Sequence, residues 1–178
     1  VPHLSFSALR ETAFWDLPPP LRVLVTGVLA NEATLAHSEE IGQERAGIGD
    51  PTDIALLIAG AQFGLVREEL ESIYPIIAEI PFEPERRFAA VVSRIDGKPV
   101  FLAKGAPERI LDMCSTWASP AGLVPIDREA ILAAAHELAR QGLRVLGFAA
   151  GEIPFEHAER IESLLEPSGL TFLGLVGL

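Results

Sequence analysis

The sequence predicts an α+β fold, in which helices pack against an antiparallel or mixed β-sheet. Two observations lead to this prediction. Apolar segments with the two-residue period of strands are interspersed along the chain with segments that have helical spacing. Between two of the strand segments stands Asp96-Gly97, which strongly indicates a β-hairpin, because a type I′ turn requires positive φ at both central positions.

Composition indicates one compact domain. The chain has 178 residues, of which 49% are hydrophobic and 22% are charged, and its mean hydropathy is +0.30. These values exclude a disordered chain and allow a large core. No apolar run approaches the roughly 18 residues of a membrane span, and no basic-flanked signal peptide opens the chain, so we expect a soluble protein. We expect a single domain over residues 1–178, in which residues 1–20 could be an N-terminal extension or linker.

The charge of the chain limits its partners. A formal net charge of −11 and a pI near 4.8 argue against nucleic acid and against direct contact with an anionic membrane surface. Any anionic ligand must therefore be held by a local basic cluster. The chain has a single cysteine, so no intrachain disulfide is expected. Its four scattered histidines have no metal-ligand spacing with each other or with that cysteine, so no metal site is expected.

The sequence predicts mainly helices in the first half of the chain. After the break at residues 18–20, apolar residues recur at helical spacing from Leu21 to Glu32, and a polar surface loop is expected over residues 37–49. Asp50 is expected to cap a helix that has Pro51 at its first position and Asp53 at its third, where the carboxylate can reach back. The remaining expected segments are Ile54–Phe63 and Val66–Ile73 as helices and Ile76–Phe82 as extended chain.

The Asp96-Gly97 turn fixes the register of its hairpin. Ile95 then pairs with Lys98, Val92 with Phe101 and Ala89 with Lys104. Arg87 and Lys104 share one face of the predicted strands and meet diagonally at the open end, about 7–8 Å apart. Phe82 lies just upstream in an extended arm, residues 80–82. An aromatic side chain beside two cations is a plausible site for a base or a phosphorylated ligand.

The second half of the chain alternates between helices and strands. Helices are expected over Arg109–Cys114, over Asp127–Gln141 with Gly142 as its stop, and around residues 158–165. Strands are expected over Leu143–Ala150 and Leu170–Leu178, and a loop over Trp117–Pro125.

Three of these polar or aromatic residues also have a structural interpretation. Phe82 alone is more often a core residue than a base platform. Asp50 is more readily a helix N-cap than a ligand. Arg144, a basic residue in an apolar strand, could either lie along the surface or point at a phosphate.

Four motifs in order resemble the P-type cation-transporting ATPases. Gly49-Asp50-Pro51-Thr52-Asp53-Ile54-Ala55-Leu56 resembles their GE/DPTE-x-AL motif, and residues 80–87 resemble PFxSxRK. Lys104-Gly105-Ala106-Pro107-Glu108 matches KGAPE, and Gly142-Leu143-Arg144-Val145-Leu146 resembles GLRVLA. The resemblance covers roughly Val23 to the end of the chain, and four ordered motifs are far more specific than a single pattern.

The resemblance implies the cytoplasmic nucleotide-binding domain of such a pump, an α+β domain with a twisted, mainly antiparallel sheet flanked by helices. In the family the motif phenylalanine stacks on adenine, which falls on Phe82, and the lysine that lines the base pocket falls on Lys104, beside Gly105. The acidic residue near adenine falls on Asp53, the second basic position on Arg87, and the arginine that reaches toward the phosphates on Arg144. Thr52 and Arg86 are expected as neighbours.

The resemblance also implies the ligand and the partners of this domain. ATP or ADP is the expected ligand, with Mg²⁺ accompanying the nucleotide and held mostly by a phosphorylation domain. The phosphorylation and actuator domains of the same pump are the expected partners, and the isolated domain is expected to be a monomer. The expected location is the cytoplasmic side of an integral membrane protein.

Departures from the family pattern and missing segments refine these expectations. Glu83-Pro84-Glu85 replaces the usual serine-containing link, and Asp53 stands where glutamate is usual, so its contact could pass through water. The chain lacks the DKTGT, TGES and GDGxND segments, so we do not expect it to catalyse phosphoryl transfer alone. It carries KGAPE and lacks the His-Pro motif of heavy-metal pumps, and it therefore resembles the calcium, sodium/potassium or proton type.

Two rival functions remain open at this point. One is a domain that keeps this fold but serves as a regulatory or interaction module without binding nucleotide, which the altered residues 83–85 allow. The other is an autonomous hydrolase, which is disfavoured because no nucleophile, base and orienting group can be assembled from the sequence.

Overall fold

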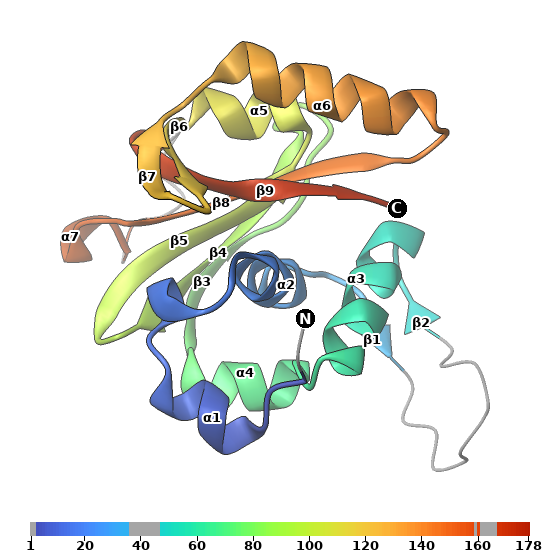
Figure 1. Ribbon diagram of the computed structural model, residues 1–178. Helices are drawn as coiled ribbons and strands as arrows, with labels where there is room; N and C mark the ends of the chain where they lie inside the picture. The colour runs from blue at the N-terminus through green and yellow to red at the C-terminus, as the bar shows by residue number, and fades with distance from the viewer. Residues whose placement is uncertain (1–2, 36–46, 159, 161–166) are drawn as a thin grey trace.

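A seven-stranded mixed sheet forms the centre of the molecule in the computed structural model, which describes residues 3–35, 47–158, 160 and 167–178 (Figure 1). The strand order is β3 (Ile76–Ile80), β4 (Phe88–Ile95), β5 (Lys98–Gly105), β8 (Val145–Glu152), β9 (Leu170–Gly177), β6 (Cys114–Ser119) and β7 (Gly122–Pro125). Neighbouring strands are antiparallel except β6 and β9, which are parallel. The predicted α+β fold with a mainly antiparallel sheet is confirmed.

Helices cover both faces of this sheet (Figure 1). One face carries α1 (Phe6–Glu11), α2 (Pro19–Leu29), α3 (Pro51–Gln62) and α4 (Arg67–Ile73). The other carries α5 (Pro107–Asp112), α6 (Arg128–Arg140) and the short α7 (Phe155–Ala158). Within the described ranges, no helix has both the length and the apolar character needed to cross a membrane.

The two faces of the sheet belong to two separate hydrophobic cores. Val91 and Leu102 pack with α1–α4 in the first core, and Phe88, Val92 and Phe101 pack with α5–α7 in the second. This division follows from the two-residue period of a strand, which places alternate side chains on opposite faces. The N-terminal segment also packs into the first core through Phe14, which is fully buried, and through Leu9 and Leu17, which are 2% exposed.

The β4–β5 hairpin has the register that its turn predicts. Ile95 pairs with Lys98, Val92 with Phe101 and Ala89 with Lys104. Asp96 and Gly97 have φ values of 50° and 79°, as a type I′ turn requires. The hairpin prediction is therefore confirmed at both the turn and the strand pairs.

Local helix signals predict the start of α3 and both ends of α6. Asp50 caps α3, Pro51 is its first residue, and Asp127 caps α6 by accepting a hydrogen bond from the Ala130 backbone N–H. Gly142 follows α6 with a φ of 83°, which is the conformation that ends many helices. The expected strands that begin near residues 143 and 170 are present as β8 and β9.

The structure corrects the predicted loop over Trp117–Pro125. These residues belong to the antiparallel pair β6–β7, and β6 also pairs in parallel with β9. Cys114 begins β6 and does not end the preceding helix. The short β7 has the sequence Gly-Leu-Val-Pro and is largely exposed. It lacks the alternation of apolar and polar residues that identifies a strand in a sequence.

Two further segments differ from the sequence prediction or lie outside the described residues. The expected surface loop over residues 37–49 falls mostly outside the described chain, and its last part contains β2 (Gly47–Ile48), which pairs with β1 (Thr34–Leu35). The helix expected around residues 158–165 also lies almost wholly outside the described ranges.

Candidate functional site

An open pocket of about 450 Å³ lies where the start of α3, the end of β5, the start of β8 and the arm converge. Each of the predicted site residues lines it: Thr52, Asp53, Phe82, Arg87, Lys104, Gly105 and Arg144. The remaining lining residues are Glu32, Gly49, Asp50, Ala106, Val145 and Leu146. The fold therefore brings the predicted residues together from positions as far apart as Thr52 and Arg144.

A buried ion pair joins Lys104 to Asp53. The Lys104 Nζ lies 2.5 Å from the Asp53 Oδ1, and each side chain is 8% exposed. β5 supplies the lysine, and the first turn of α3 supplies the carboxylate. A charge at this depth requires a partner, because an unpaired ion in a poorly hydrated environment is strongly destabilising. The lysine ammonium is thus neutralised inside the protein before any ligand arrives.

The second oxygen of Asp53 holds a different segment of the chain. Asp53 Oδ2 accepts a hydrogen bond from the Glu32 backbone N–H at 3.1 Å. The sequence indicates that this carboxylate can reach back to its own helix start, whereas the structure shows its two oxygens in contact with Lys104 and with the Glu32 backbone. Asp53 therefore joins α3 to the end of α2 and to β5.

Phe82 is a half-exposed aromatic residue on the arm. Its side chain lies outside both hydrophobic cores, and the residue is 48% exposed. Its backbone N–H donates a hydrogen bond to Glu32 Oε2 at 3.0 Å. An exposed ring beside a cavity offers a flat apolar surface on which a planar ligand can stack.

Two arginines stand at the rim of the pocket, each near a carboxylate. Arg87 Nη2 lies 3.5 Å from Glu108 Oε2, and Arg144 Nη1 lies 3.8 Å from Asp50 Oδ2. The arginine side chains are 52% and 60% exposed, so these pairs are weak and can exchange for another anion.

Arg87 reaches the pocket by a route that the strand pattern does not predict. β4 begins at Phe88, and Arg87 precedes it with a left-handed φ of 62°. The expectation that Arg87 occupies a regular strand position beside Lys104 is therefore wrong, although both residues line the cavity. Arg86 is not among the lining residues, and its guanidinium faces Glu83 at 3.8 Å.

Asp50 and Thr52 form the helix-capping wall of the pocket. The Thr52 backbone N–H donates to Asp50 Oδ1 at 2.8 Å, and the Thr52 hydroxyl is hydrogen-bonded to the same oxygen. The hydroxyl bond is the main reason that the pKa of Asp50 lies below its usual value, and the charge of Arg144 acts in the same direction. Asp50 therefore remains an anionic cap, as its position predicts.

Gly105 is required by the close approach of two chain segments. A Cβ at this position would lie 2.4 Å from the Arg87 carbonyl oxygen and 2.7 Å from the Phe88 Cα. Both neighbours are backbone atoms, which cannot move aside as a flexible side chain can. The absence of a side chain at Gly105 thus allows the open end of the hairpin to close beside the pocket.

Sequence reasoning missed Glu32 and the apolar wall formed by Ala106, Val145 and Leu146. Val145 and Leu146 stand next to Arg144 in a motif that the sequence does show, so their position was available from β8. Glu32 belongs to none of the motifs and meets the arm 50 positions away in the sequence. Only the fold brings it to the pocket.

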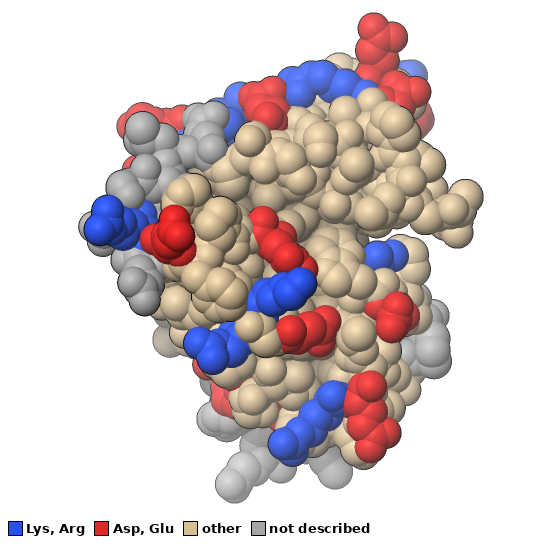
Figure 2. Space-filling model, turned by 90° about the vertical axis from the view of Figure 1, so that its left-hand side faces the viewer, with Lys and Arg blue, Asp and Glu red and all other residues tan. Residues whose placement is uncertain are grey.

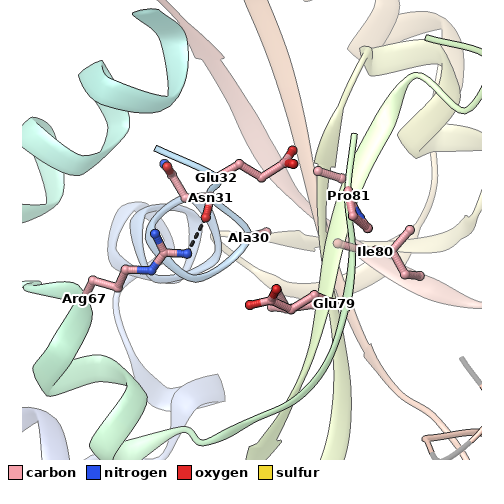
Figure 3. Close-up of a pocket in the computed structure, with 10 residues that line it drawn as sticks. Ala30, Asn31, Glu32, Arg67, Glu79, Ile80 and Pro81 are labelled. Carbon is pink, nitrogen blue, oxygen red and sulfur yellow. Dashed lines mark hydrogen bonds between the residues drawn. The ribbon is translucent and has the colours of Figure 1, made fainter. Parts of the chain in front are cut away.

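A second cavity of about 280 Å³ adjoins this pocket, and Glu32 lines both. Figure 3 shows that Arg67 points from α4 toward the end of α2, while Glu79, Ile80 and Pro81 lie on the opposite side. The described residues contain no group of three or more His, Cys, Asp or Glu side chains placed to hold a metal ion.

Fold and site together define an α+β domain with an open pocket that combines an aromatic surface, a buried ion pair and rim arginines. Residues 21–178 match the family model of the P-type ATPase cytoplasmic domain N. The chain therefore belongs to this family, and its relatives are cation-transporting P-type ATPases.

Three relatives illustrate the range of similarity. The chain is 38% identical over 165 residues to the cation-transporting ATPase pma1 of Synechocystis sp., covering 91% of this chain and 18% of that protein. It is 40% identical over 144 residues to the probable cation-transporting ATPase F of Mycobacterium tuberculosis, covering 76% and 16%. It is 34% identical over 155 residues to calcium-transporting ATPase 1 of Bacillus cereus, covering 85% and 16%. The chain thus spans less than a fifth of the length of these relatives.

Proposed function

We propose that this domain binds ATP by its adenine base and presents the γ-phosphate to an aspartate on a separate phosphorylation domain of a cation-transporting pump. The observation that carries the proposal is the single pocket that contains the half-exposed Phe82, the buried Lys104–Asp53 pair and the two rim arginines. Each part suits one region of a nucleotide: a ring to stack on, polar groups for the base edge and cations for the phosphates.

In this proposal the base enters between Phe82 and the apolar wall of β8. Val145 and Leu146 line the pocket at the start of β8, and Arg144 immediately precedes them, so apolar contact and a cation come from consecutive residues. Arg87 and Arg144 take phosphate oxygens in exchange for Glu108 and Asp50, which pair with them in the free domain. Mg²⁺ arrives with the nucleotide and is held mainly by the phosphorylation domain.

The domain should bind ATP weakly. One aromatic stack contributes about 1–3 kcal/mol, and each charge-assisted hydrogen bond contributes about 1.5–3 kcal/mol. Association costs at least about 4 kcal/mol, and the rim arginines must also leave their carboxylate partners. The dissociation constant should therefore lie at roughly 0.1 to several mM. Such an affinity suits a site that must release ADP in every transport cycle.

Phe82→Ala should remove most of this affinity, because it deletes the stacking surface and leaves the cores intact. Loss of one stack of about 1–3 kcal/mol corresponds to about 5- to 150-fold weaker binding. The affinity can be measured by NMR titration of the isotope-labelled domain with ATP. Phe155→Ala is a matched control, since Phe155 is 63% exposed and does not line the pocket.

Titrations of the wild-type domain and of Phe82→Ala distinguish the proposed ATP binding from its rival function. Equal ATP affinity in wild-type and Phe82→Ala protein would contradict stacking on Phe82. Failure of the wild-type domain to bind ATP at tens of millimolar would favour the alternative, a regulatory or interaction module that no longer binds nucleotide.

A further inference from the structure

Glu32 connects two parts of the pocket that are distant in the sequence. It follows α2, and its side chain extends across the adjoining cavity toward Pro81 on the arm (Figure 3). There its Oε2 accepts the hydrogen bond from the Phe82 backbone N–H at 3.0 Å. A carboxylate that accepts a backbone N–H makes a charge-assisted bond, which is stronger than a neutral one.

The backbone around Glu32 is held from both sides. Asp53 accepts its N–H at 3.1 Å, and Asn31 Nδ2 donates to the Asp53 carbonyl oxygen at 2.9 Å. Arg67 donates to the Ala33 carbonyl oxygen at 2.9 Å and also to that of Asn31. Asn31 is 4% exposed and Asp53 6%, so this support is buried. Glu32 thus projects from a fixed base.

The arm has less support of its own. Its pairing with β4 ends at Ile80, opposite Ala90, and Pro81 has no N–H to donate. The chain is next fixed at Glu83, whose carbonyl oxygen accepts hydrogen bonds from the Arg86 and Arg87 backbone N–H groups. Phe82 lies between these two points, where the Glu32 carboxylate holds its backbone.

We propose that Glu32 is a positioning residue for the stacking platform, an inference that rests on the proposed nucleotide function. Its carboxylate fixes the Phe82 backbone and so sets the place of the ring before the nucleotide arrives. The same residue ties this position to the Lys104–Asp53 pair, because Asp53 holds the Glu32 N–H. The Phe82 ring and the Lys104–Asp53 pair therefore keep a fixed spacing, which lowers the entropic cost of ordering the site when the nucleotide binds.

The test compares Glu32→Ala with Glu32→Gln in ATP titrations followed by NMR. Both variants remove the same negative charge, but glutamine keeps an oxygen that can accept the Phe82 N–H. ATP should bind about 2- to 12-fold more weakly to Glu32→Ala than to Glu32→Gln, which is the effect of ordering one additional side chain on binding. The Phe82 amide proton should also exchange faster in Glu32→Ala than in Glu32→Gln.

Repeating the comparison in a Phe82→Ala background separates positioning from direct contact. The difference between the Ala and Gln variants should disappear there, because no ring remains to be placed. The inference is overturned if the two variants bind ATP equally in the presence of Phe82. It is also overturned if their difference persists without Phe82, since Glu32 would then act on the ligand itself. Absence of ATP binding by the wild-type domain would instead overturn the nucleotide function, and this inference with it.

Discussion

At the scale of single residues, burial distinguishes two lysine–carboxylate pairs. The Lys104 and Asp53 side chains are each 8% exposed, whereas Lys98 and Glu152 are 60% and 54% exposed at a separation of 3.4 Å. Removing one member of a buried pair leaves an uncompensated buried charge, whereas the remaining side chain of an exposed pair is readily solvated by water. The two pairs should therefore respond very differently to the same substitution.

Lys104→Met should lower the free energy of unfolding by about 3–5 kcal/mol, because the Asp53 carboxylate then stays buried without its cation. Lys98→Met is the matched control and should cost less than about 1 kcal/mol. Urea unfolding of the two variants and the wild type measures both values. Equal losses would show that Lys104 and Asp53 are solvated in solution.

Cys114, the single cysteine of the chain, gives the domain a specific response to alkaline pH. Burial raises the pKa of its thiol from 9.0 to about 12, and its Sγ donates to the Ile110 carbonyl oxygen at 3.2 Å. Between these two pH values the folded protein keeps the thiol proton that the unfolded chain releases. Stability therefore falls as the pH rises through this window, and the thiol contributes no pH dependence well below 9.0.

Wild-type protein should accordingly lose more stability than Cys114→Ala between about pH 8 and about pH 11, a range that crosses the ordinary thiol pKa of 9.0. Urea unfolding at several pH values across this range measures the difference. Burial likewise raises the pKa of Tyr74 to about 12, so both proteins should share a further loss above pH 10. Parallel curves for the two proteins would contradict the perturbed thiol pKa.

At the scale of elements, local chemistry explains which segments the sequence predicts. The Asp96-Gly97 turn sets the β4–β5 register, and Asp50 and Asp127 set two helix starts, because each acts within a few residues of itself. The sequence does not predict the β6–β7 pair, because β7 is exposed and β6 gains its parallel partner β9 only in the fold. Glu32 was missed for a similar reason, since its hydrogen bond to Phe82 spans 50 positions.

Gly105→Ala should strain the open end of the hairpin, where a Cβ would meet the Arg87 and Phe88 backbone at 2.4 and 2.7 Å. A forced shift of this kind costs about 1–3 kcal/mol, and it should also weaken ATP binding by moving Arg87. Gly147→Ala should cost less, because Gly147 is the β8 partner of Gly105 and its Cβ would lie 3.2 Å from the nearest atom, the Pro107 Cα, which is a tight contact but not an overlap. Urea unfolding measures the free energy of unfolding of Gly105→Ala and Gly147→Ala. Equal values for the two variants would contradict the steric explanation.

At the scale of the whole molecule, the pocket lies where β5 ends and where β8 and α3 begin. The two hydrophobic cores hold these elements in place. The acidic excess does not form one continuous patch on the face shown in Figure 2, where Lys and Arg lie beside Asp and Glu around broad uncharged areas. The sequence predicts each proposed ligand residue through its motif, whereas the order of the strands and the place of Glu32 require the fold.

The most direct test of the central claim is an NMR titration of the wild-type domain with ATP, followed residue by residue. The amide signals of Phe82, Lys104 and Gly105 should shift together with a dissociation constant of roughly 0.1 to several mM. The signal of Leu123 on β7, which does not line the pocket, should remain in place. Unchanged signals of the pocket residues at tens of millimolar ATP would contradict the proposal that this pocket holds the nucleotide.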